Sequence, residues 1–466
     1  MKYLKKETEL IEKIKREIEV IVEHQLSELV KWDSNRGFIE LELEICKRLN
    51  KIGAVLLERL IPYLYGDGYE GSRLDFEDKI SYRCEVICKE RRLRTVFGDI
   101  IISRAVYSEY YSGSYLSFLD EKLGIHQKRI CPLLTYWSNL MGTIAPFDEA
   151  ADILNKIRGI EISSKQIELS TESMAREITR IQESKIKEIK LDKDGKIQPS
   201  TINLNLNATR TVYIESDGCM INTDKDWKEC KTFMLFELEK IKEDENRLKN
   251  KFYYSTMGTI DDMKRHLKYN LERYCGKDEV KIVCVGDGAK WIWNMIRELF
   301  PKDFFPSGVI EIIDWYHAME KIGDIKDEVL NDTEEGKKFY EECKEYLAEG
   351  NIEVVEQILV QLRDKQSSLE KKEFVDQRLK YFMNNKEKMR YSKYKENGLC
   401  IGSGAIESAN KYVVQRRLKL AGMKWNEQNA NYMVHLRTEY TNKELDAHYG
   451  IINNPLLGNI VLEAET

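Results

Sequence analysis

Three short apolar runs in the middle of the chain constrain the fold more than any other feature. They lie in TVYIESDGCMI, KIVCVGDGAKWIWNMIRELF and GVIEIIDWYHAMEKI, and the last two pass through a turn into a segment of helical spacing. Strands that alternate with helices pair in parallel, because the helix returns the chain to the same end of the sheet. Residues 206–317 are therefore predicted to form a core of strands and helices. This core also contains a strand-rich meander in WKECKTFMLFELEK and KFYYSTMG.

The segments on either side of this core have different residue patterns. Residues 1–125 predict long amphipathic helices and then a β-hairpin, and residues 126–205 predict helices followed by a polar linker. Residues 318–397 have helical periodicity throughout and predict an all-α insertion. Residues 398–440 combine a glycine-rich turn with a helix, and residues 441–466 form a tail. The predicted class is α+β or α/β, with a mostly helical N-terminal region.

Composition narrows the class of protein further. Hydrophobic residues make up 42% and charged residues 33%, which is typical of a helix-rich globular protein. No run reaches the apolar length of a membrane span, and the charged N-terminus does not resemble a signal peptide. The ten cysteines are scattered, as expected of reduced thiols in a cytoplasm.

The N-terminal half holds two candidate nucleic-acid contacts. Residues 147–174 have the rhythm of a helix-turn-helix, with a helix end near Gly159 and a serine cap at 163 or 164. Many helical hairpins outside DNA-binding proteins share this rhythm. The β-hairpin carries Arg91, Arg92 and Arg94, which either contact phosphates or form a solvated face.

Charge is segregated along the chain. The formal net charge is −6, yet residues 386–424 hold ten Lys and Arg against three Glu. A local basic face on an acidic protein is compatible with nucleic-acid binding, and a solvated helical surface is the alternative.

Two aspartates are predicted at strand ends, where parallel strands bring ligands together. Asp217 follows VYIES and Asp287 follows IVCVG, and each precedes a glycine. A turn accounts equally well for either Asp-Gly pair alone. Glu407 lies in GSGAIES at the first turn of a helix, where the helix dipole favours a carboxylate in any case. Together the three carboxylates suit Mg²⁺, which prefers oxygen ligands and keeps room for substrate phosphates.

Through these residues and the motifs around them, the chain resembles the DDE transposases of bacterial insertion sequences. ESDG, GDGAKW, DWYH and GSGAIESANKYVVQRRLKLAGMKW occur in this order, and they are most similar to the ISLre group, which is related in pattern to Mutator-type transposases. The resemblance covers most of the chain from the FGDIIISRAVY hairpin onward, and the last motif is its most specific part.

The resemblance implies an RNase H-like core interrupted by the all-α insertion and preceded by a DNA-binding region. It implies that Asp217, Asp287 and Glu407 are catalytic and hold Mg²⁺ or Mn²⁺, as two ions. Their carboxyl groups are then expected to converge within metal-bridging reach. It also places Asp314 and His317 beside the site, although a histidine near a strand end is often purely structural.

The resemblance gives the basic helix and the rest of the chain expected roles. DNA contacts are expected from Lys411, Arg416, Arg417, Lys419 and Lys424, with Lys411 and Lys419 on the helix face of Glu407. The implied activity is metal-dependent cleavage and 3′-hydroxyl strand transfer at terminal inverted repeats, directed into target DNA. A homodimer or larger assembly in a bacterial cytoplasm, associated with the nucleoid, is implied as well. An RNase H-like nuclease or resolvase and a domesticated DNA-binding protein remain the alternatives.

Overall fold

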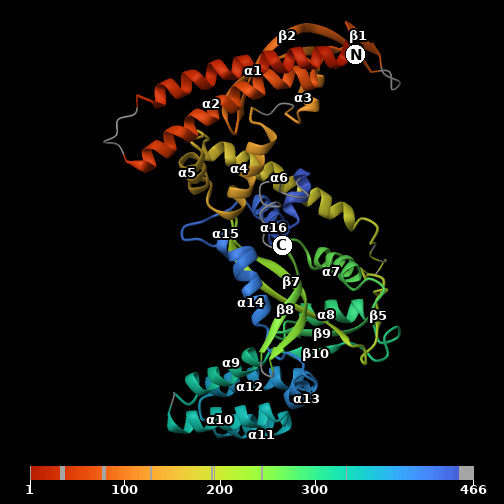
Figure 1. Cartoon of the computed structure of the whole chain (residues 1–466). Coiled ribbons are helices and arrows are strands. Elements are labelled where there is room, and N and C mark those ends of the chain that lie inside the picture. The colour runs from red at the N-terminus through yellow and green to blue at the C-terminus, as the bar shows by residue number, and fades with distance from the viewer. Residues whose placement is uncertain are drawn as a thin grey trace. The chain divides into compact units, whose positions relative to one another are not determined.

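The computed structural model describes residues 2–31, 37–75, 80–125, 129–189, 191, 193, 195–242, 245–331 and 333–450 (Figure 1). The chain forms two compact units, Met1–Thr171 and Glu172–Thr466. The boundary falls within the segment 126–205 that the sequence analysis treats as one piece. Of the expected tail, residues 451–466 lie outside the described residues.

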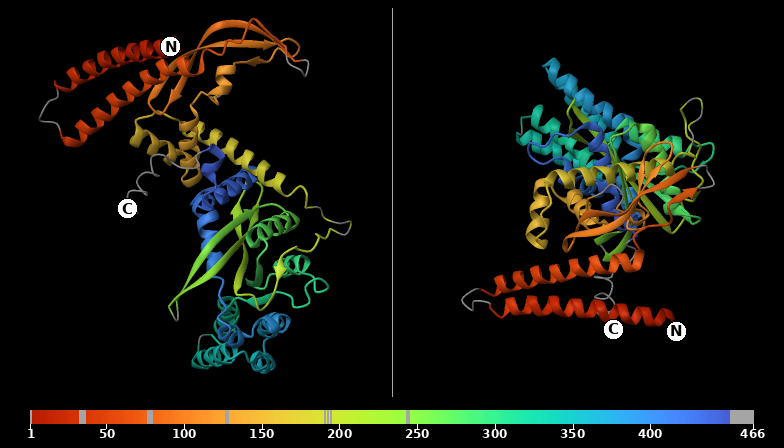
Figure 2. Two further views of the ribbon diagram at one scale, coloured as in Figure 1. Left: turned by 45° about the vertical axis from the view of Figure 1, so that its right-hand side comes forward. Right: turned by 90° about the horizontal axis from the view of Figure 1, so that it is seen from above.

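The first unit begins with two long helices, α1 (Lys2–Leu29) and α2 (Phe38–Tyr65), which run side by side in both views of Figure 2. A four-stranded antiparallel sheet follows, in the order β1 (Arg73–Asp75), β2 (Ser81–Thr95), β3 (Gly98–Glu109) and β4 (Tyr115–Leu116). The long pair β2–β3 is the expected hairpin. Its apolar face packs with α2 and α3 in a small core of Ile61, Leu93, Ile100, Ile102, Leu119 and Ile125.

Four helices complete this unit and lead out of it: α3 (Phe118–Lys122), α4 (Pro132–Ile144), α5 (Phe147–Arg158) and α6 (Ser164–Lys185). The turn between α5 and α6 matches the sequence pattern. Gly159 is left-handed, with φ 64°, and the Ser163 hydroxyl accepts a hydrogen bond from the Gln166 amide at 3.2 Å. Ser163 is therefore the helix cap, and Ser164 begins the helix.

The second unit is built on one mixed sheet. Its strand order is β10 (Ile310–Ile313), β9 (Glu279–Gly286), β6 (Arg210–Asn222), β7 (Trp227–Lys242) and β8 (Glu245–Thr256), with β5 (Asn203–Leu204) beside β9. Strands β6, β7 and β8 form the antiparallel meander, whereas β9 runs parallel to both β6 and β10. The parallel strands are nearly continuous apolar runs, as strands buried on both faces must be.

Helices cover the faces of this sheet. They are α7 (Ile260–Cys275), which a Thr259–Asp262 capping box starts, and α8 (Lys290–Leu299). The sheet and these helices bury a single large core that includes Val212, Phe233, Leu267, Ile282 and Ile296.

Between β10 and residue 398 the described elements are all helical. They are α9 (Trp315–Glu328), α10 (Glu334–Ala348), α11 (Ile352–Lys365), α12 (Leu369–Asn385), the short 3₁₀ turn η1 (Lys386–Lys388) and α13 (Tyr391–Glu396). Figure 1 shows them gathered at one end of the sheet. Phe339, Leu359, Val375 and Phe382 join them to the core of the unit.

The chain then returns to the sheet in one helical segment of changing pitch: α14 (Gly404–Ala409), the π-helical η2 (Asn410–Gln415) and α15 (Arg416–Leu418). Helix α16 (Glu427–Thr441) and the 3₁₀ turn η3 (Leu445–Tyr449) end the described part. The expected class is confirmed as a mixed α+β chain with a helical N-terminus, a hairpin sheet and a mixed sheet with parallel strands. Within the described ranges, no helix combines the length and apolar character needed to cross a membrane.

Candidate metal centre

The two predicted aspartates occupy different positions in their strands. Asp287 directly follows the last residue of β9, as expected. Asp217 does not end a strand, because β6 continues to Asn222 through antiparallel pairing with β7, in which Asp217 faces Thr232. The parallel pairing of β6 with β9 does stop at Glu215. Asp217 therefore lies just past the end of the parallel ladder, although its own strand continues.

A tight turn positions Asp287. One carboxylate oxygen accepts a hydrogen bond from the Ala289 amide at 2.8 Å, and the Tyr381 hydroxyl donates to the Asp287 carbonyl at 2.9 Å. Gly288 has φ +100°, a conformation that favours glycine, and a Cβ there would lie 2.8 Å from the Tyr381 ring. The Asp-Gly pair thus makes a turn and places a carboxylate at the end of β9.

Hydrogen bonds to buried acids hold the helix of Glu407 against the sheet. The Ile406 amide donates to Glu215 at 2.8 Å, and the Ser403 amide donates to Asp314 at 3.0 Å. Glu407 itself is exposed, and its side chain makes no hydrogen bond with any described residue. The start of α14 is therefore fixed, while the carboxylate of Glu407 stays free to bind a ligand.

The two glycines before Glu407 have different roles. From the sequence, Gly402 and Gly404 are expected to form the turn that lets the backbone bring Glu407 to the sheet, and neither has a positive φ. A Cβ on Gly402 would meet the Tyr316 ring at 3.0 Å, whereas a Cβ on Gly404 would meet open space. Close packing therefore requires glycine at 402 alone.

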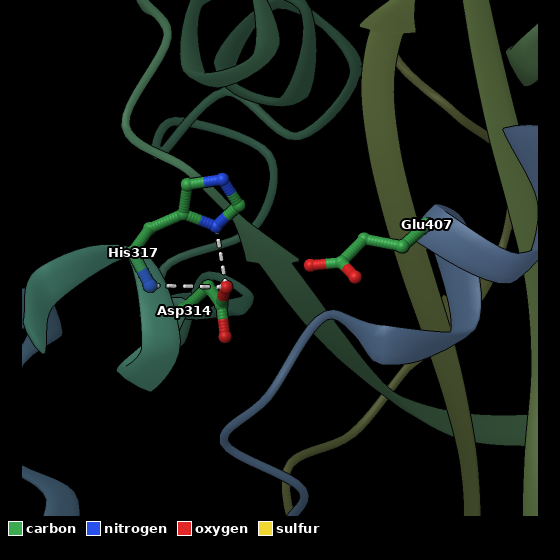
Figure 3. A group of neighbouring side chains, drawn as sticks. All are labelled: Asp314, His317 and Glu407. Carbon is green, nitrogen blue, oxygen red and sulfur yellow. Dashed lines mark hydrogen bonds and ion pairs between the residues drawn. The ribbon is translucent and has the colours of Figure 1, made fainter. Parts of the chain in front are cut away.

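Asp314, His317 and Glu407 offer ligand atoms that all lie within 4.8 Å of one another. Figure 3 shows Glu407 extending from its helix toward the hydrogen-bonded pair of Asp314 and His317. Among the described residues this is the one such group of three, so Asp217, Asp287 and Glu407 do not form a set of that spacing by themselves.

Asp314 is nevertheless poorly suited to bind a metal. It is buried, and it accepts four hydrogen bonds, from the amides of Tyr316, His317 and Ser403 and from the His317 ring at 2.5 Å. A carboxylate offers about four lone-pair sites, so its accepting capacity is filled. Asp314 caps α9, supports the loop before α14 and orients His317.

The electrostatics of this pair agree with an orienting role. The hydrogen bond to Asp314 raises the pKa of His317 above its ordinary value, against the effect of burial. Burial alone would raise the pKa of Asp314, but the hydrogen bonds from His317 and Ser403 outweigh it and leave the pKa lowered. With Nδ1 held by Asp314, the other ring nitrogen of His317 is left available to a ligand.

Asp217 has a partner that the sequence analysis missed. The amide nitrogen of Asn410 donates to one of its oxygens at 2.7 Å, and the Gly218 amide donates to the other. Burial, and after it the negative charge of Asp287, raises the pKa of Asp217. Asn410 lies three residues after Glu407, a helical spacing that points to the same face. This spacing could have identified Asn410 from the sequence, but Lys411 was predicted on that face instead.

Glu215 is the second missed residue. It is fully buried in β6, two positions before Asp217 and thus on the same face of the strand. One oxygen accepts from Ile406, and the other has no hydrogen-bond partner. Burial raises its pKa to about 8, and the charges of Asp314 and Glu407 add to the effect. A glutamate within the otherwise apolar VYIES run was the signal for it.

The donor set fits a hard divalent cation. Asp217, Asp287 and Glu407 each keep unused oxygen capacity, and Mg²⁺ or Mn²⁺ prefers such ligands. Two buried oxygens in the same neighbourhood, on Glu215 and Asn410, lack any hydrogen-bond partner, which is costly unless another ligand satisfies them.

The basic residues after Glu407 lie on a helical segment that changes pitch. It is π-helical from Asn410 to Gln415, and Lys419 follows the helix end. Lys411, Arg416, Lys419 and Lys424 are exposed. The expectation for Arg417 needs correction, because it is only 1% exposed and packs over the Trp425 ring at 5.1 Å. Burial removes it from phosphate contact.

The hairpin arginines belong to the first unit and pair with acids there. Arg91 forms an ion pair with the nearly buried Asp120 and thus supports the fold. Arg92 and Arg94 both pair with Asp99, at 2.6 and 2.8 Å. Arg92 remains 75% exposed and is the best placed of the three for contact with a phosphate.

Comparison with known proteins gives one family. The model of an uncharacterised protein family, UPF0236, matches residues 33–448. The UPF0236 protein TTE0610/TTE0881/TTE1053/TTE2432 of Caldanaerobacter subterraneus subsp. tengcongensis is 25% identical over 417 residues, which cover 86% of this chain and 78% of that protein. Another UPF0236 protein of this organism, whose name joins eleven loci from TTE0033 to TTE2212, is 24% identical over 85% of this chain and 76% of its own length. The chain belongs to the uncharacterised protein family UPF0236.

Proposed function

We propose that this chain is a DDE-type transposase of an insertion sequence, which cleaves DNA at the ends of its element and joins the freed 3′-hydroxyl to target DNA. One observation carries the proposal: four acids from β6, from the end of β9 and from α14 lie in one neighbourhood, where the parallel pairing of β6 with β9 ends. These are Glu215, Asp217, Asp287 and Glu407, and Asp314 and His317 lie against them.

The architecture supports this proposal. An antiparallel meander lies beside two parallel strands, and an all-helical segment separates β10 from α14. This arrangement is compatible with the RNase H-like core and helical insertion that the sequence resemblance implies. The two catalytic strands and the closing helix are then brought together across the 120 positions that separate Asp287 from Glu407.

The relatives add an independent argument. One UPF0236 protein carries eleven locus names within a single genome, and another carries four. A protein sequence repeated at many loci is what a mobile element produces, whereas an ordinary enzyme or regulator rarely needs so many copies.

In the proposed reaction Asp217, Asp287 and Glu407 would hold divalent cations. A bound Mg²⁺ or Mn²⁺ pair would lower the barrier to phosphodiester attack by polarising the phosphate and activating the attacking oxygen. Asn410 keeps the Asp217 carboxylate in place, and Asp314 keeps His317 in place. His317 is thus a positioning group or proton carrier beside the cations, and the exposed Arg416, Lys419 and Lys424 contact phosphates.

Transposition requires two element ends to be held together, so we propose a homodimer or larger assembly acting on the nucleoid in the cytoplasm. The helices α1 and α2 are suited to this task, since they expose large apolar side chains. Ile11, Val20, Leu26, Phe38, Ile39, Leu43, Leu49 and Leu64 are each more than half exposed.

The experiment incubates the full-length protein and Mg²⁺ or Mn²⁺ with labelled DNA that carries the ends of its own element. A transposase gives cleaved ends and joined strands, and Asp287→Asn abolishes both while it keeps DNA binding. Nicked products that never join would support the nuclease or resolvase instead. If the folded wild type binds DNA but leaves it intact with either metal, it is a DNA-binding protein and the proposal is wrong.

A further inference from the structure

A second charged site lies at the starts of the parallel strands, whereas the acids lie at their ends. A pocket of about 780 Å³ opens where β9 and β10 begin, and the end of the helical insertion forms its other wall. Six cationic side chains line it: Lys281, Arg297, Lys302, Lys386, Lys388 and Lys393. The basic segment found in the sequence is thus divided, since Lys386, Lys388 and Lys393 line this pocket and the remaining cations do not.

Internal ion pairs neutralise the acids of the pocket. The Glu311 carboxylate pairs with Lys388 at 3.4 Å and with Arg297 at 3.6 Å. Glu387 pairs with Arg390 at 3.5 Å. These contacts use two of the six cations, Lys388 and Arg297.

Four lysines of the pocket form no ion pair with a described residue: Lys281, Lys302, Lys386 and Lys393. They come from four different elements, namely β9, the loop after α8, η1 and α13. The six cations of the pocket outnumber its two carboxylates, so an anion there lowers their electrostatic energy. The four lysines lie on four different elements around the pocket. An anion that contacts all of them is therefore expected to carry several charges.

The wall of the pocket is fixed in place. The Tyr394 hydroxyl hydrogen bonds to the carbonyls of Glu311 and Glu387 at 3.3 and 3.2 Å, so it ties β10 to the end of the insertion. The ammonium of Lys388 lies 4.6 Å from the centre of the Trp293 ring. A preformed wall loses little conformational entropy when it binds a ligand.

We infer that this pocket binds the phosphodiester backbone of DNA, as a contact separate from the acid cluster. The inference rests on the proposed function, which supplies DNA as the polyanion. Lysines act as point charges for phosphates and read no base sequence, so the site holds DNA irrespective of its sequence. Such a contact suits target or flanking DNA, whose sequence varies, better than the terminal repeats.

The test measures the binding of the full-length chain to a fluorescently labelled duplex of random sequence over a range of salt concentrations. The pocket variant replaces Lys281, Lys302, Lys386 and Lys393 with alanine. The matched control replaces Lys321, Lys337, Lys344 and Lys380, which lie on helices of the same insertion and are paired with acids. Both variants change the net charge equally, and thermal melting confirms that each is folded.

The pocket variant is expected to bind more weakly, and its slope of log affinity against log salt should fall by about 3 to 4, since each phosphate contact contributes about 0.9. The control should match the wild type, and replacing the four pocket lysines with arginine should restore binding. Wild-type affinity and salt slope in the pocket variant would overturn the inference, even if the wild type cleaves its element ends. If the wild type binds no DNA under any condition, the proposed function itself fails.

Discussion

Glu215→Gln is the substitution whose effect follows most directly from the structure. The carboxyl of Glu215 is fully buried, it accepts one hydrogen bond from the Ile406 amide, and its second oxygen has no partner. Burial raises its pKa from 4.5 to about 8 in the folded chain. A glutamine keeps the size and the accepting oxygen but carries no charge at any pH.

The magnitude follows from the linkage between protonation and folding. A raised pKa means that the folded state holds the proton more tightly, so this contribution to stability is complete below pH 4.5 and is lost as the pH rises toward 8. Within that window each pH unit costs the wild type about 1.4 kcal/mol of unfolding free energy. At pH 7 the loss is about 3 kcal/mol, and Glu215→Gln avoids it.

The assay is urea unfolding of both proteins in EDTA, at several pH values from 5 to 8. The difference in unfolding free energy between variant and wild type should grow in favour of the variant as the pH rises. Taking the difference at each pH cancels the titration of all other groups. Glu396→Gln, at an exposed position on α13, serves as the control for a Glu-to-Gln change outside the acid site. Parallel pH profiles for wild type and Glu215→Gln would refute a buried, protonated Glu215.

Other predictions concern packing and hydrogen bonding around the site. Gly288→Ala should destabilise the chain by about 1–3 kcal/mol in thermal melts, because of its positive φ and the nearby Tyr381 ring, whereas Gly404→Ala should be neutral or slightly stabilising. Arg417→Ala should lower stability in the same melts and leave the salt slope of DNA binding unchanged, whereas Arg416→Ala should reduce that slope by about 1 and leave stability unchanged. Asn410→Ala should lose about 1–3 kcal/mol of stability and weaken Mn²⁺ binding in calorimetry, since it frees Asp217. Equal stability of Arg417→Ala and Arg416→Ala, or an Asn410→Ala protein with unchanged affinity for Mn²⁺, would count against these assignments.

The sequence predicts the elements that local pattern determines. The run IVCVG followed by Asp287-Gly288 gave both the strand end and the turn, and IIDWYH gave a strand followed by a helix. Both results depend on residues close in the chain, where apolar runs and turn preferences decide the structure. The order in which strands and helices follow one another along the second unit was predicted from the same patterns.

The errors come from interactions between distant residues. Pairing with β7 extends β6 beyond Asp217, and no local signal measures that pairing. Arg417 is buried because Trp425 returns to the sheet through a bridge with Thr223. Asn410 donates a hydrogen bond to Asp217 across 193 positions of the chain. Each case needs the partner's position, which spacing along one segment does not give.

The site shows the same division. The three expected acids were predicted as carboxylates at strand ends or at a helix start, which is wrong for Asp217, since β6 continues past it. Glu215 was hidden because a single glutamate in an apolar strand looks the same whether it points to solvent or to a cluster of acids. Asp314 was placed beside the site, but its role in supporting the loop of Ser403 depends on a contact across 89 positions.

Titration of the full-length protein with Mn²⁺, with free Mn²⁺ followed by electron paramagnetic resonance, tests the central claim most directly. The wild type should remove Mn²⁺ from solution, and Asp217→Asn, Asp287→Asn and Glu407→Gln should each lose that binding while they remain folded. Glu342→Gln, at an exposed position on α10, should bind as the wild type does. A folded wild type that leaves all Mn²⁺ free, or three variants that bind as tightly as the wild type, would contradict the assignment of these acids as a metal centre.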